Sequence, residues 1–234
     1  MPGVISAGGP ETAVAGATIL QQGGNAVDAA VAAAFASFIA EVGVVHLGGS
    51  GIAHIFDPQN GRSLVYDFFS TTPGLDGRPP ASMDFQAVTI DFGATTQDFH
   101  LGRASVSVSG NIAGLCTLAS NHGRLPLATL LQPAIRLSEE GTAIEPFQAD
   151  TCKRLAPLYT HTPGMRQIFA ANGRIIQPGE HLHIPHLADT LRALAAEGAD
   201  YARHGRLAQA ILADQQAHGG LLTAADLAGY EGRQ

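Results

Sequence analysis

The sequence is short of charged residues. Only 14% of its 234 residues are charged, 45% are hydrophobic, and 13 basic residues against 20 acidic ones give a formal net charge of −7. This balance argues against a nucleic-acid partner, which requires a basic face. No block of like charge suggests a membrane-surface patch. Because so little charge is available to cover a surface, we expect another part of the molecule to cover much of this one.

Cysteines and long apolar runs are also scarce. Two cysteines make no disulfide framework, and Cys116, inside the apolar run 112–116, is expected to be a buried, unreactive thiol. The longest apolar run, residues 29–40, is well short of the roughly 20 residues that span a bilayer. The first residues lack the charged and apolar regions of a signal peptide. The cytoplasm and, after processing, the periplasm both stay open as locations.

The most informative stretch is the start of a predicted buried helix. Gly23 and Gly24 end one helix, and Asn25 forms a capping box for the next with Asp28, three residues on. Residues 29–40 then carry almost only small apolar side chains. A helix that is apolar all round must be buried on every side. The pattern therefore predicts a central helix inside a layered enzyme.

The rest of the chain predicts mixed α and β structure in a single domain over residues 1–234. Strands are expected early, over residues 52–56, 63–68 and 104–108, with an Asn60-Gly61 turn joining the first two. Helices are expected over residues 11–22, 112–122, 126–140, 187–197 and 206–217, with a helical pattern from Phe147 onward. Residues 73–99 lack clear periodicity and are predicted to form a long, partly functional loop.

Four segments recur in the order in which one enzyme family has them. They are residues 23–31, the glycine-rich turn at 47–51, the stretch 114–141 with His122-Gly123-Arg124-Leu125-Pro126, and residues 219–230 with Asp226-Leu227 and Tyr230. Together they span nearly the whole chain, which resembles the gamma-glutamyltransferase family of N-terminal-nucleophile hydrolases. The resemblance implies an α+β fold, a four-layer αββα sandwich assembled from two chains cut from one precursor.

The same resemblance implies a chemistry. In the family the precursor cleaves itself, and the threonine exposed at the new N-terminus attacks a gamma-glutamyl amide such as glutathione, with its own α-amine as general base. Backbone N–H groups hold the oxyanion. That threonine lies beyond the Asp226-Leu227 segment and outside this chain. We therefore expect this chain to be the N-terminal part of the larger subunit. It would hold no catalytic residue, metal or cofactor, and it would be inactive without the C-terminal small subunit.

The chain departs from the family at the residue that binds the substrate's α-carboxylate. The family has an arginine there, after Asp-Phe, and a bidentate arginine suits a carboxylate. Here Asp67 and Phe68 are followed by Phe69. Losing the contact should cost on the order of 2–5 kcal/mol for an unchanged substrate. Together with the segment 92–100, the Phe68-Phe69 pair is similar to a divergent branch of the family.

Other residues near this position are candidates for substrate binding. Arg78 and Arg103 are the cations nearest in sequence, and one of them is expected to take over the carboxylate. Gln97 and His100 are polar candidates in the same stretch. Each has a structural alternative, since Phe69 is equally expected to be a core aromatic, and Gln97 and His100 could satisfy backbone groups in a loop.

Two other motifs favour a structural interpretation. The glycines at 48–51 precede a strand instead of opening a helix, so they predict a tight turn more than an anion cradle. His181 and His183 lie on one side of an extended segment, but no cysteine or carboxylate pair stands nearby at ligand spacing. They predict a turn into the next helix more than a zinc site.

Two alternative functions stay open beside the main one. Phe69 favours an acylase or amidase of the same fold that acts on a non-glutamyl acyl group. A relative that never cleaves itself would instead be a non-catalytic binding protein.

Overall fold

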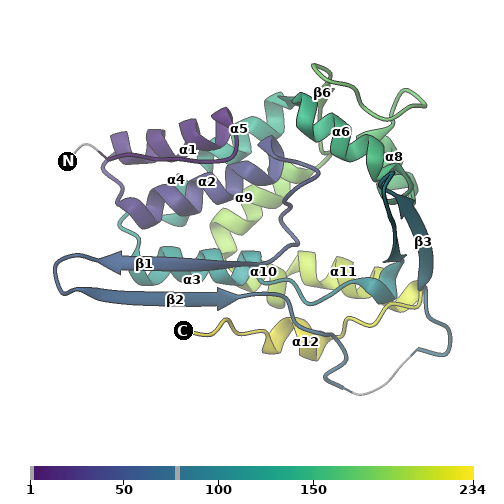
Figure 1. Ribbon diagram of the computed structural model, residues 1–234. Coiled ribbons are helices and arrows are strands. Elements are labelled where there is room, and N and C mark those ends of the chain that lie inside the picture. Colours follow the sequence, from purple (N-terminus) through teal and green to yellow (C-terminus); the bar gives the residue numbers. More distant parts are fainter. Residues whose placement is uncertain (1–2, 77–79) are drawn as a thin grey trace.

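The computed structural model describes residues 3–76 and 80–234, and it places helices against one side of a β-hairpin (Figure 1). The helices are α1 (Pro10–Gln21), α2 (Ala26–Ala40), α3 (Asn111–His122), α4 (Leu127–Leu130), α5 (Gln132–Glu140), α6 (Pro146–Arg154), α7 (Ala156–Tyr159), α8 (Pro163–Phe169), α9 (Leu187–Glu197), α10 (Asp200–Arg203), α11 (Arg206–Ala217) and α12 (Ala224–Gly229). The strands are β1 (Gly51–Asp57), β2 (Arg62–Phe68), β3 (Gln86–Asp91), β4 (Thr96–Leu101), β5 (Thr142–Ala143) and β6 (His181–Leu182), with a 3₁₀ turn η1 (Arg103–Ser105). No helix in the described ranges is both long and apolar enough to cross a membrane.

Helix α2 is the buried centre predicted from its alanine-rich sequence. It packs against α1, α3 and α5, and the side chains of Phe35 and Ile39 are fully buried. The predicted capping box is confirmed. The side chain of Asn25 accepts a hydrogen bond from the backbone N–H of Asp28 at 2.9 Å, and the Asp28 carboxylate accepts one from the N–H of Asn25 at 2.8 Å.

The carboxylate of Asp28 also joins two of the four segments singled out in the sequence. It is fully buried, and both of its oxygens accept from the backbone N–H of Arg124 at 3.0 Å, in the segment that follows α3. The side-chain amide of Asn25 donates to the backbone carbonyl of His122 at 2.6 Å. The start of α2 and the end of α3 are therefore held together by polar contacts inside the core.

Strands β1 and β2 form the predicted antiparallel hairpin, and its two faces differ. Tyr66 and Phe68 on the inner face are buried in the main hydrophobic core beneath the helices. On the outer face Ile52, Phe56 and Val65 are 63%, 59% and 51% exposed. No helix covers this outer face in the described part of the chain (Figure 1). Apolar side chains on an open sheet face indicate a surface that another element covers.

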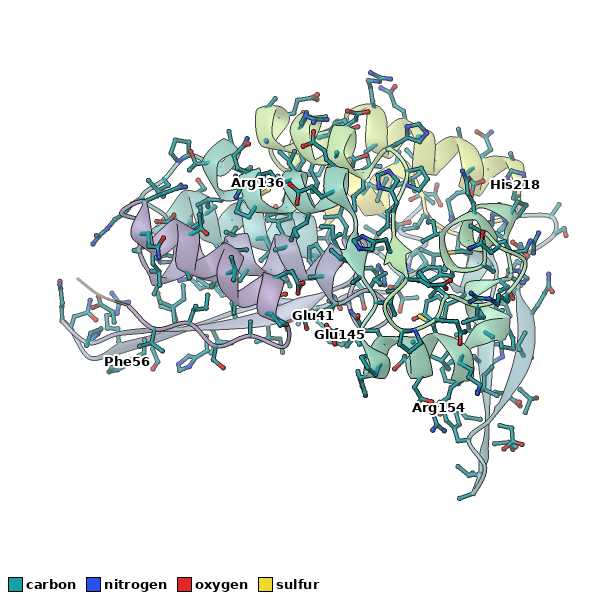
Figure 2. All side chains as sticks on the ribbon, turned by 90° about the horizontal axis from the view of Figure 1, so that it is seen from above. Glu41, Phe56, Arg136, Glu145, Arg154 and His218 are labelled. Atoms are coloured by element: carbon teal, nitrogen blue, oxygen red, sulfur yellow. The ribbon has the colours of Figure 1, made fainter. Side chains whose placement is uncertain are left out.

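The predicted loop at 73–99 is wrong over its second half, because β3 and β4 form an antiparallel hairpin there. The hairpin extends away from the helices (Figure 2). Almost all its side chains are exposed or half-buried, so neither strand shows the alternation that marks a strand with one buried face. The turn is made by Gly93 in the left-handed region, with φ 87°, and its N–H donates to the Asp91 carboxylate.

Three further local expectations need correction. The single helix expected over 126–140 is two helices, α4 and α5, because Pro133 has no N–H to continue the helical hydrogen bonds. No strand forms over 104–108: Ala104 and Ser105 belong to η1, and Val108 makes a single bridge with Thr71. Cys116 is half-buried instead of buried, although burial still raises the pKa of its thiol to about 12. The thiol is therefore protonated at neutral pH and unreactive, as expected.

The second half of the chain follows the predicted helical pattern. Helices α9 and α11 cover the expected ranges, 187–197 and 206–217. A smaller core lies between α6, α8 and β6, around Cys152, Phe169 and Leu182. His181 belongs to the short strand β6 and pairs with Ala143. Residues 3–76 and 80–234 hold no group of three His, Cys, Asp or Glu side chains placed to bind a metal.

Candidate substrate-binding segment

The residues from Asp67 to Leu75, here called the 67–75 segment, leave the end of β2 and carry Phe69. The backbone N–H of Phe69 donates to the Asp67 carboxylate at 2.9 Å, which turns the chain at the end of the strand. The ring of Phe69 is 59% exposed. Phe69 is therefore not part of the hydrophobic core of this chain, and its ring is free to contact a ligand or another subunit.

The 67–75 segment is anchored by the last residues of the chain. Backbone hydrogen bonds of 2.8 and 2.7 Å pair Asp67 with Arg233. The hydroxyl of Tyr230 donates to the carbonyl oxygen of Phe69 at 2.8 Å. The buried Asp226 carboxylate accepts from the backbone N–H groups of Gly74, at 2.9 and 3.0 Å, and of Leu75, at 3.0 Å. The backbone around Phe69 is thus held at three points.

Asp226 completes a capping box that the sequence shows. Its carboxylate also accepts from the N–H and hydroxyl of Thr223, at 2.9 and 2.8 Å, at the start of α12. Burial alone would raise the pKa of Asp226, but the hydrogen bonds from Gly74, Leu75 and Thr223 outweigh it and lower the pKa. The Thr-x-x-Asp spacing could have indicated the cap, but nothing local in the sequence indicated the bonds to Gly74 and Leu75.

A carboxylate is hydrogen-bonded to the backbone of Phe69. Asp67 accepts the N–H of Phe69, and it adds to the rise that burial produces in the pKa of Tyr230. A carboxylate this close to the Phe69 backbone disfavours the approach of a second carboxylate from a substrate.

Arg103 is paired with two carboxylates at the base of the β3–β4 hairpin. It donates to Asp214 on α11 at 3.1 Å and lies 3.4 Å from Asp84. The hydrogen bond from the Arg103 side chain lowers the pKa of Asp214. The pKa of Asp84 is also lowered, mainly by the hydrogen bond from the backbone N–H of Arg103. In this arrangement its guanidinium joins the hairpin to α11. Arg78, the other candidate cation, lies outside the described residues.

Gln97 and His100 lie on β4, an element separate from Phe69. Gln97 is exposed and pairs in register with Ile90. The His100 ring stacks on Phe85 with ring centres 4.6 Å apart. In the part of the chain that the structure describes, no hydrogen bond or ring contact joins either residue to Phe69. The sequence candidates thus fall into two groups, one at the end of β2 and one on the hairpin.

The glycine-rich residues 48–51 form the expected tight turn into β1. The N–H of Gly49 donates to the carbonyl of His46 at 3.0 Å, and the carbonyl of Gly49 accepts from Gly110 and Asn111 at 3.0 and 3.1 Å. The side-chain amide of Asn111 also donates to the His46 carbonyl at 3.0 Å. The turn therefore contacts the start of α3, and a Cβ at Gly49 would press on Asn111.

Comparisons with known proteins cover almost the whole chain. The family model of gamma-glutamyltranspeptidase matches residues 12–234. The acylase ACY 1 proenzyme of Pseudomonas sp. (strain SE83) is 37% identical over 232 residues, which are 97% of this chain and 41% of that protein. The glutathione hydrolase proenzyme of Escherichia coli (strain K12) is 30% identical over 217 residues, 92% of this chain and 36% of that protein.

A solved structure agrees with the sequence matches. Helicobacter pylori gamma-glutamyltranspeptidase superposes with a TM-score of 0.82 and 28% sequence identity, over 99% of this chain and 64% of that chain. The chain belongs to the gamma-glutamyltranspeptidase family. The α+β fold class and the N-terminal-nucleophile hydrolase type expected from the sequence are confirmed. The chain spans only 36–41% of the length of the curated relatives named above.

Proposed function

We propose that this chain is the N-terminal part of the larger subunit of a gamma-glutamyltransferase-like amidohydrolase, folded as one domain over residues 1–234. The observation that carries the proposal is the superposition of 99% of the chain on a gamma-glutamyltranspeptidase. The enzyme would cleave gamma-glutamyl amide bonds of glutathione-type substrates. Its nucleophile would be the threonine exposed by self-cleavage, in a segment outside this chain.

The exposed outer face of the β1–β2 hairpin favours the presence of a partner fragment that covers it. Ile52, Phe56 and Val65 expose apolar surface there, and burying such surface stabilises an interface by about 25 cal/mol per Å². The C-terminal small subunit would cover this face, as the αββα arrangement of the family implies. This chain by itself would contribute the helical layer and one wall of the substrate pocket, without catalytic activity of its own.

An acylase acting on a non-glutamyl acyl group is the second candidate. It is favoured by Phe69, whose exposed ring stands where the family has its carboxylate-binding arginine, with Asp67 next to it. The 37% identical relative, an acylase proenzyme, also supports it. An aromatic wall would select an acyl group without a charge at this position.

The test compares two amide substrates in the full-length protein. The wild type and the Phe69→Arg variant are assayed with a gamma-glutamyl anilide and with an uncharged acyl anilide of similar length. If the protein uses gamma-glutamyl substrates through other contacts, the wild type cleaves the first substrate, and Phe69→Arg changes its kcat/KM less than tenfold. If it is an acylase, the wild type prefers the second, and Phe69→Arg shifts the preference toward the gamma-glutamyl substrate by tenfold or more.

The Phe69→Leu variant is the control, because it removes the ring without adding charge. Intact mass and N-terminal sequencing show whether the full-length protein splits, and at which residue. An unsplit protein that cleaves neither substrate would contradict both proposals and favour a non-catalytic binding relative. Hydrolysis by a purified chain ending at Gln234 would contradict the placement of the nucleophile outside it.

A further inference from the structure

A cleft of about 630 Å³ lies between the second half of α3, the segment leading into α4, and Gly198, Ala199 and Arg203 before and at the end of α10. None of the residues that line it belongs to the 67–75 segment or to the β3–β4 hairpin. Its polar wall consists of hydroxyl, amide and guanidinium groups, and none of its lining residues is Asp or Glu. The polar lining residues that matter here are Ser120, Asn121, Arg124 and Arg203.

Arg203 is half-buried and has no carboxylate partner in the described part of the chain. Its Nε atom is buried and has no hydrogen-bond partner in the described part of the chain. One terminal nitrogen donates to the backbone carbonyl of Tyr230 at 3.3 Å. No described carboxylate lies within ion-pair distance of Arg203. An anion beside this half-buried guanidinium would compensate its partial loss of water.

Arg124 brings a second cation to the same cleft. Its backbone N–H is already used, since it donates to both oxygens of the buried Asp28. Its side chain is exposed and makes no ion pair within residues 3–76 and 80–234. Arg124 and Arg203 thus line one cleft whose lining residues include no Asp or Glu. Two positive charges on the walls of one cleft attract an anion.

The pKa of Cys116, which lies on the cleft wall, is affected by the charge of Arg203. Burial raises the pKa of this thiol to about 12, and the positive charge of Arg203 acts in the opposite direction. The guanidinium therefore lies close enough to the wall formed by α3 to influence a group on it. The thiol itself stays protonated and takes no part in binding an anion.

We propose that this cleft binds a small oxyanion, the phosphate or carboxylate group of a small-molecule ligand, between Arg203 and Arg124. The planar fork of a guanidinium matches two oxygens of such a group. Ser120 and Asn121, which also line the cleft, supply further donors. Phe69 is not among the residues that line the cleft, although Arg203 also donates to the carbonyl of Tyr230.

The test is isothermal titration of the full-length protein with inorganic phosphate, and separately with malonate, at constant ionic strength. We expect saturable binding of at least one of them at a single site. Arg203→Met and Arg124→Met should each weaken it by about tenfold or more, the usual effect of losing a charged hydrogen bond. Arg136→Met is the matched control, because it removes one exposed positive charge on α5, outside the cleft (Figure 2). It should leave the affinity unchanged.

Tighter binding of phosphate would indicate a phosphate group in the ligand, and tighter binding of malonate a carboxylate group. Both results support the proposed site. Absence of saturable binding of both probes overturns it. An equal loss in Arg136→Met overturns it too, because the binding would then follow net charge alone. If Arg203→Met does not fold, Arg124→Met decides, since the Arg124 side chain makes no described hydrogen bond. The amide-hydrolysis assay is not involved, so failure here and failure of the proposed function are separate results.

Discussion

The hydroxyl of Tyr230 donates a hydrogen bond to the carbonyl oxygen of Phe69 at 2.8 Å, across 161 positions of sequence. The sequence predicts that Phe69 stands where the family has a substrate-binding arginine, and Tyr230 belongs to the last of the four segments that resemble the family. The backbone around the variable position is thus set by a segment far from it in sequence. The side chain at position 69 can change while the backbone that presents it keeps its anchors.

The Tyr230→Phe variant tests this anchor. It removes the hydroxyl and should destabilise the protein by about 1 kcal/mol, the net value of a typical hydrogen bond. Hydrogen exchange should speed up at residues 70–75. Tyr159→Phe is the matched control, since it removes a hydroxyl that donates to the Gly43 carbonyl at 2.9 Å. Equal exchange at residues 70–75 in both variants would mean that Tyr230 does not hold the segment.

The Asp226→Asn variant tests the buried carboxylate that holds Gly74 and Leu75. At neutral pH we expect a loss of about 2–3 kcal/mol, because charged hydrogen bonds are replaced by weaker ones. Since folding lowers the pKa of Asp226, its contribution is fully present above the unfolded pKa, about 3.9, and is lost as the pH falls through the folded value. The difference in unfolding free energy between wild type and variant should therefore shrink below about pH 4.

Asp150→Asn is the control for this measurement. Asp150 forms an exposed pair with Arg154 on α6, and such a pair contributes little to stability because solvent screens it. Urea titrations of the wild type and both variants from neutral to acidic pH give the comparison. A gap between wild type and Asp226→Asn that stays constant over the whole pH range would contradict a depressed pKa.

The Asn25→Ala variant tests the cap of the central helix. It removes the cap of α2 and the 2.6 Å hydrogen bond to the carbonyl of His122, so we expect a loss of about 1–2 kcal/mol. Thr162→Ala is the matched control at the start of α8, where the cap makes only a local bond to Met165 at 3.2 Å. Thermal or urea unfolding measures both, and a smaller effect at Asn25 than at Thr162 would contradict the role given to the cap.

The elements that could be predicted from the sequence are those specified by neighbouring residues. The Asn25–Asp28 capping box, the alanine-rich α2 and the Asn60-Gly61 hairpin all depend on contacts a few positions apart. The helix break before Pro133 also has a local cause, but the apolar spacing over 126–140 predicted one continuous helix. The β3–β4 hairpin left no signal because neither of its strands has a fully buried face, and alternation records only burial on one face.

The sequence by itself determined the family and the central helix, and it predicts that Phe69 replaces an arginine of the family. Only the tertiary structure decided that Phe69 is exposed beside Asp67, that Tyr230 and Asp226 hold its backbone, and that Arg103 is engaged with two carboxylates. The physical reason is the range of the contacts. A capping box joins residues three positions apart, and helical packing repeats about every 3.6 residues, so both can be recognised in the sequence. A single hydrogen bond between residues more than 150 positions apart leaves no such pattern.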